Sequence, residues 1–110
     1  MSKAKGKTVR TRVKRREVER ELGKLVRERE RLREAAPGGS PARPIEVTSP
    51  AVIEPSARST PCHQCGGELA IDEHAVEAHG GERLRVVRAA CRRCHTRREI
   101  WFRLARRTVH

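Results

Sequence analysis

"CRRCH", residues 91–95, is the stretch on which the fold depends, because it fits three different chemistries. Cys-x-x-Cys-His is the pattern for covalent attachment of a c-type haem, whereas Cys-x-x-Cys alone is typical of a redox pair or of half a zinc site. A second pair lies upstream, with 25 residues between Cys65 and Cys91. Two such pairs predict one site for a single structural Zn²⁺ ion, with four thiolate ligands: Cys62, Cys65, Cys91 and Cys94.

The Cys-x-x-Cys spacing has a geometric reason. Two intervening residues allow both sulfurs of a tight turn, here called a knuckle, to point to the same side while N–H groups of the turn donate hydrogen bonds to sulfur. Two knuckles that face each other complete a tetrahedron with Zn–S distances of about 2.3 Å. The first knuckle continues with Gly66 and Gly67, and glycine supplies the positive φ that such a turn usually needs.

Three segments after the first pair alternate apolar with polar residues, as β-strands do. They are "ELAI", "GERLRVVRAA" and "REIWFRL". We expect a three-stranded antiparallel sheet with the metal at one end. The alternation places Trp101 and Arg103 on the outer face of the last strand. It also places each of the following sets on a single face of its own strand: Leu69 with Ile71, Leu84 with Val86, and Ile100 with Phe102 and Leu104.

With its knuckles "CHQCGGEL" and "CRRC" and the hairpin between them, the segment 62–104 resembles the zinc-ribbon superfamily. The resemblance implies a small all-β domain stabilised by metal. It also implies a role as a nucleic-acid-binding or protein-binding module in the transcription or translation machinery. The 25-residue gap exceeds the common spacing of about 15–20 residues, and we expect the excess in "DEHAVEAHGG", as a long first hairpin or a loop beside it.

The composition supports a metal independently of the motif. The chain has 110 residues, of which 35% are hydrophobic and 36% charged, with one Trp, one Phe and no Tyr. A domain of this size with so few large apolar residues rarely folds without an added cross-link. Structural zinc supplies on the order of 10–16 kcal/mol in small finger peptides, and this is folding energy when the metal-free form is disordered.

The haem and redox interpretations of "CRRCH" explain less of the chain. Haem attachment requires export and a second iron ligand, yet Met1 is the single methionine and the other cysteine pair would have no role. A redox dithiol would call for a βαβ context, which the sequence lacks. Four thiolates leave no coordination position for water, so we expect no enzyme and interpret the five histidines as solvent-facing residues near the knuckles.

The rest of the chain divides by composition. We expect a disordered basic arm over 1–9, a basic helix over 10–36, a disordered proline-rich linker over 37–61 and the zinc ribbon over 62–110. All six prolines fall within the linker. The helix carries a thin apolar stripe that could lie along a protein partner or pair with itself: Val18, Leu22, Leu25 and Leu32. Gly23 and Arg29 weaken a coiled coil, which favours either docking on a larger partner or a marginal lone helix.

The formal net charge is +12, and residues 1–36 carry 14 basic and 6 acidic side chains. Such a segment either binds a polyanion or serves as a solubilising tail. Trp101 beside arginines could stack on a base, or it could cover the second face of the sheet or pack under the long loop. The candidate nucleic-acid-binding residues are Lys3, Lys5, Lys7, Arg10, Arg12, Lys14, Arg15, Arg16, Arg83, Arg85, Arg92, Arg93, Trp101 and Arg103.

These observations predict a nucleic-acid-associated zinc ribbon that acts on the transcription or translation machinery, with DNA or RNA as its partner. The alternative is a protein-interaction adaptor that docks on RNA polymerase or the ribosome through the helix. No apolar run reaches the length of a signal-peptide core or a membrane span. We therefore expect no membrane partner and a reducing, cytoplasmic location, where disulfides are disfavoured.

Overall fold

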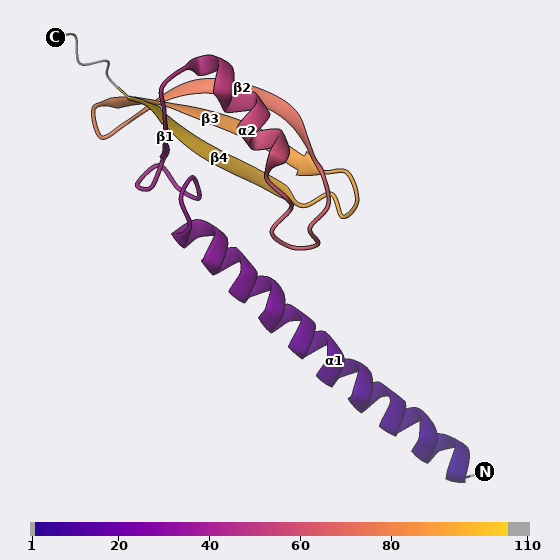
Figure 1. Cartoon of the computed structure of the whole chain (residues 1–110). Coiled ribbons are helices and arrows are strands. Elements are labelled where there is room, and N and C mark those ends of the chain that lie inside the picture. Colours follow the sequence, from indigo (N-terminus) through magenta and orange to yellow (C-terminus); the bar gives the residue numbers. More distant parts are fainter. Residues whose placement is uncertain (1, 106–110) are drawn as a thin grey trace, which may run out of the picture.

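The computed structural model of the chain describes the backbone of residues 2–105 and the side chains of residues 11–105. Along the chain lie α1 (Ser2–Ala35), β1 (Ile45–Val47), the 3-10 helix η1 (Pro50–Val52), α2 (Ile53–Ser59), β2 (Leu69–His79), β3 (Glu82–Cys91) and β4 (Arg97–Leu104). The helix α1 projects from a small sheet domain, so the molecule is elongated, with extents of 84 × 25 × 19 Å (Figure 1). No described helix carries an apolar run long enough to cross a membrane.

The helix α1 begins at Ser2, not at residue 10, so most of the segment expected as a disordered arm continues the helix. Lys, Arg and Glu, which dominate this segment, are good helix formers. The helix ends where Pro37 and Gly38 follow; Gly38 has a φ of 82°. A Cβ on Gly39 would lie 1.9 Å from the carbonyl oxygen of Arg33, so only glycine allows the chain to turn back there.

The segment 37–61 is not the disordered linker expected from its prolines, since it contains β1, η1 and α2. Its scattered aliphatic residues are part of the core: Ile53 and Ala57, one turn apart on α2, are both fully buried. The prolines occupy positions that regular structure tolerates, such as Pro50 at the start of η1. The segment is therefore ordered, although its proline content predicted a disordered linker.

The sheet has four strands in the order β1-β4-β3-β2. The expected antiparallel pairs are present, with Val87 opposite Ile100 and Leu69 opposite Cys91. The expected three-stranded antiparallel sheet is corrected to a four-stranded mixed sheet, because β1 adds to β4 in parallel. The long first hairpin is confirmed: β2 continues to His79 and turns through Gly80 and Gly81 into β3.

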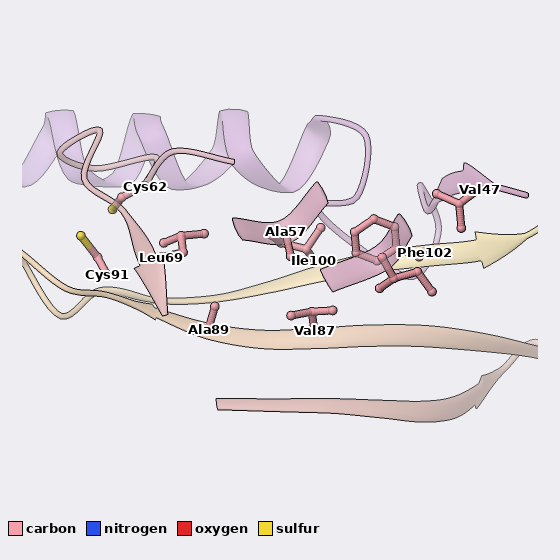
Figure 2. Close-up of a cluster of buried hydrophobic side chains, with 10 residues drawn as sticks. Val47, Ala57, Cys62, Leu69, Val87, Ala89, Cys91, Ile100 and Phe102 are labelled. Carbon is pink, nitrogen blue, oxygen red and sulfur yellow. The ribbon is translucent and has the colours of Figure 1, made fainter. Parts of the chain in front are cut away.

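Apolar side chains cover both faces of the sheet. The face beneath α2 carries the larger cluster, with the sulfurs at one end (Figure 2): Val47, Ile53, Ala57, Cys62, Leu69, Val87, Ala89, Cys91, Ile100 and Phe102. The opposite face buries Leu84, Val86 and Trp101, with Ala75 packed against them. Leu84 and Val86 do share a face, as expected, but that face is the one of Trp101 and not the one of Leu69 and Phe102.

Candidate metal centre

The four cysteine sulfurs lie together at one end of the sheet, all within 4.8 Å of one another. The Sγ atoms of Cys62 and Cys94 are 3.6 Å apart, and those of Cys65 and Cys91 are 3.4 Å apart. A tetrahedral ion with metal–sulfur distances of about 2.3 Å requires its ligand atoms about 3.8 Å apart. The four residues predicted as ligands therefore form a set that fits one tetrahedral metal ion.

The first knuckle is closed by two backbone hydrogen bonds. The N–H of Gly66 donates to the carbonyl oxygen of Cys62 at 2.8 Å, and the N–H of Cys62 donates to that of Gly67 at 2.9 Å. Gly66 has a φ of 75°, as expected for this turn. A Cβ on Gly67 would lie 2.9 Å from Cys91 Sγ. Glycine is therefore required at both positions, at one by conformation and at the other by the neighbouring sulfur.

The second knuckle repeats this arrangement and explains the His in "CRRCH". The N–H of His95 donates to the carbonyl oxygen of Cys91 at 3.0 Å, and the N–H of Cys91 donates to that of Thr96 at 3.0 Å. His95 has a φ of 63°, so it takes the place that Gly66 has in the first knuckle. His95 is exposed. Its role in the motif is to close a turn through its backbone.

Backbone N–H groups stabilise negative charge on the sulfurs. Gln64 N lies 3.4 Å from Cys62 Sγ, and the N atoms of Arg93 and Cys94 lie 3.4 and 3.5 Å from Cys91 Sγ. The N–H groups of Cys94 and Arg93 hold the pKa of Cys91 below its usual value. These donors favour thiolate, which is the form that binds metal.

The four thiols differ in how readily they lose a proton. Hydrogen bonds from the side chain and backbone of Thr96 lower the pKa of Cys94 to about 6. For Cys65 the Gly67 N–H lowers the pKa, but the hydrogen bond with the Cys91 sulfur and burial outweigh it and raise the pKa to about 11. Protons held in the cluster must leave when a metal ion binds, so metal binding is coupled to proton release.

A cation lies close to the sulfurs. Arg98 donates from Nη1 to the carbonyl oxygen of Pro61 at 3.1 Å, next to Cys62. Burial and the charge of Arg33 lower the pKa of Arg98, whereas the charge of the Cys62 thiolate acts in the opposite direction. A metal bound to four thiolates carries a net negative charge, and a neighbouring guanidinium offsets it.

The predicted nucleic-acid-binding residues do not form one cluster. The side chains of Arg12, Lys14, Arg15 and Arg16 are exposed on the projecting helix, and those of Lys3, Lys5, Lys7 and Arg10 lie outside the described side chains. Arg92 and Arg93 are exposed at the second knuckle, whereas Arg83 and the half-buried Arg85 lie near the far end of the hairpin. Arg103 is already paired, with Glu82 at 2.8 Å and Glu46 at 3.6 Å.

Trp101 is not a stacking platform. Its side chain is 5% exposed and packs with Leu84 and Val86 on the second face of the sheet. The imidazole of His79 lies edge-on to the indole, with ring centroids 4.8 Å apart. The interpretation as a cover for the second sheet face is the correct one. The residues of the helix stripe, in contrast, are all between 44% and 66% exposed: Val18, Leu22, Leu25 and Leu32.

Two of the polar contacts that were not predicted involve Arg88 and His63. Arg88 bridges the three antiparallel strands by pairing with Glu73, Glu77 and Glu99. His63, expected to face solvent, has a side chain only 8% exposed and lies 2.7 Å from Glu30 of α1. The charged residues that alternate along the strands indicate the ion pairs of Arg88. Nothing in the sequence indicates the contact of His63, because its partners are 33 residues apart.

The chain matches no protein-family model, no curated protein and no solved structure. The metal centre therefore rests on the geometry of its four sulfurs.

Proposed function

We propose that the chain is a zinc-ribbon protein that binds nucleic acid and has no catalytic role. Four thiolates suit zinc among the common cellular metals. A closed set of four protein ligands, with no position for water, is typical of a structural zinc ion. When bound, the ion cross-links the two knuckles and supplies folding energy to a domain with a small core.

The observation that carries the nucleic-acid proposal is the N-terminal half of α1. Eight basic residues occur between Lys3 and Arg16, and no acidic residue precedes Glu17. The backbone of this half is helical and points away from the sheet domain (Figure 1). A dense set of cations on a projecting helix is an electrostatic footprint for phosphate.

Salt titration tests this proposal. If about four phosphates are contacted, the logarithm of the binding constant for duplex should fall against the logarithm of salt with a slope of about −3.6. Replacing Arg12, Lys14, Arg15 and Arg16 by Gln should weaken binding at least tenfold and flatten the slope. A matched control replaces four cations in the half of α1 that also carries acids: Arg20, Lys24, Arg27 and Arg31. Equal losses in both variants, or no binding in low salt, would contradict the proposal.

A second candidate is favoured by the exposed apolar stripe of α1. Leucines that are half exposed on a helix are typical of a surface that docks on another protein. In this alternative the chain is an adaptor for a component of the transcription or translation machinery, and its charge only steers the encounter. A complex that persists in high salt, but is lost when Leu22 and Leu25 are changed to Asp, would favour the adaptor.

A further inference from the structure

The first knuckle holds α1 through three contacts. The side chain of Gln64 donates from Nε2 to the carbonyl oxygen of Val26 at 3.1 Å. In return Arg29 Nη1 donates to the carbonyl oxygen of Gln64 at 2.8 Å. His63 Nε2 lies 2.7 Å from Glu30 Oε2. We call these five residues the clasp: Val26, Arg29, Glu30, His63 and Gln64.

The two knuckle members of the clasp are the residues between Cys62 and Cys65, so the metal turn itself supplies them. The helix is also fixed at its C-terminal end. Arg33 pairs with Glu30 and donates from Nη1 to the carbonyl oxygen of Gly39 at 3.1 Å. Arg43 caps the helix by donating to the carbonyl oxygen of Ala35 at 2.7 Å. The helix is therefore held at two places, where a flexible tether was expected.

Beyond the clasp, residues 2–25 of α1 extend for about 36 Å at 1.5 Å per residue. An α-helix of this kind is about 10–12 Å across. The major groove of B-form DNA is about 12 Å wide and admits such a helix. The major groove of A-form RNA is deep and narrow and does not. The shape of the basic half of α1 therefore fits duplex DNA better than duplex RNA.

The aromatic residues argue against a single-stranded partner. Sequence-independent binding of single strands relies on exposed aromatic rings on which bases stack. The chain has one Trp, one Phe and no Tyr, and both Trp101 and Phe102 are buried. Without base stacking, the cations are the main source of affinity. Duplex DNA presents a denser array of phosphates than a single strand does.

A second set of cations lies beside the clasp. Arg92 and Arg93 are exposed, and a Cβ on Gly67 of the first knuckle would lie 3.2 Å from the Cβ of Arg93. The helical rise between residues 14 and 29 is about 22 Å, which corresponds to roughly six to seven base pairs of B-form DNA at 3.4 Å per pair. Because α1 is clasped, the two sets are presented at a fixed separation.

We infer that the nucleic-acid partner is double-stranded DNA. The first cysteine knuckle fixes α1 to the sheet domain through the clasp, so that the two form one rigid unit. The basic half of the helix lies along the major groove of the DNA. This inference rests on the proposed function. It adds the class of nucleic acid and makes the metal knuckle a determinant of DNA affinity, although no metal ligand touches the DNA.

The partner class is tested with three probes of the same sequence and length, about 20 base pairs or nucleotides: duplex DNA, single-stranded DNA and duplex RNA. Fluorescence anisotropy at one salt concentration should give the tightest binding for duplex DNA, by about tenfold over the other two. Equal or tighter binding of single-stranded DNA or duplex RNA would overturn the inference and leave the proposed function standing. Binding to none of the three would overturn the proposed function as well.

The clasp is tested by changing Glu30→Gln together with Gln64→Ala, with Glu21→Gln as the charge-matched control. Glu21 lies on α1, and among residues 11–105 it pairs only with the exposed Lys24, 3.7 Å away. The clasp variant should keep its metal, broaden the distance distribution in small-angle X-ray scattering, and bind duplex DNA about five- to tenfold more weakly despite its more positive charge. The control should keep the wild-type shape and affinity. A clasp variant with wild-type shape, or with a broadened shape and wild-type affinity, would overturn the rigid unit.

Discussion

His95 stands where the first knuckle has Gly66, and a non-glycine residue at a φ of 63° is strained. Changing His95→Gly should therefore stabilise the metal-bound form, by about 1 kcal/mol, whereas His95→Val should destabilise it by at least about 1 kcal/mol because a β-branched residue tolerates this region worst. Thermal unfolding of the two variants with metal bound checks the pair. Metal loss in both variants would instead show that the imidazole has a role of its own.

The protonation states of the thiols predict how the metal affinity depends on pH. At pH 7 the Cys65 thiol, with a pKa of about 11, still holds its proton, whereas Cys94, with a pKa of about 6, is largely ionised. Zinc uptake at pH 7 should therefore release protons, and the affinity should rise with pH. Below pH 6 Cys94 is protonated as well, so the affinity should fall more steeply. Competition with a chelating dye between pH 5 and 8 measures this. An affinity independent of pH would contradict the ligand set.

Among the helices and strands, α2 is the one that covers the sheet face with the larger core cluster, and the sulfurs lie at one end of that cluster. Ile53 is fully buried in the cluster beneath α2, whereas its neighbour Val52 is 45% exposed. Changing Ile53→Ala should cost about 2–4 kcal/mol of unfolding free energy, and Val52→Ala less than about 0.5 kcal/mol. Chemical denaturation of the metal-bound form separates the two. Similar costs would mean that the segment 37–61 does not belong to the core.

The elements that sequence patterns predicted are those with a local signal. The spacing of four cysteines located the metal centre, and the alternation in "REIWFRL" located β4. Ile45 and Val47 gave no such signal, because a strand of three residues is recognised only by its partner, here Phe102 to Leu104. Trp101 was ambiguous for a related reason: alternation tells which residues share a face, but not whether the second face is covered. The clasp depends on a turn and a helix that meet only in the fold.

At the scale of the whole molecule, the two parts should respond differently to metal removal. We expect the sheet domain to depend on a metal cross-link between its four cysteines. The helix α1 contributes a helical signal of its own to the far-ultraviolet circular dichroism. Chelation should therefore shift the fluorescence of Trp101 to longer wavelength, because this single indole is buried in the folded domain. Part of the helical signal should persist, although an isolated helix is marginal in water. Readdition of zinc, but not of magnesium, should restore the emission. An unshifted emission after complete chelation would show that the sheet folds without metal.

The ligands lie at the base of the hairpin formed by β2 and β3, and the turn at Gly80 and Gly81 is at its opposite end. Pairs of residues can be added or removed at that tip, one on each strand, with no change in the distance between the sulfurs. A single-residue change needs an irregularity such as the bulge between Ile71 and Glu73. Chains that share this centre should therefore differ in the spacer between their cysteine pairs mostly by even numbers, and a search for them should leave the length of that spacer free.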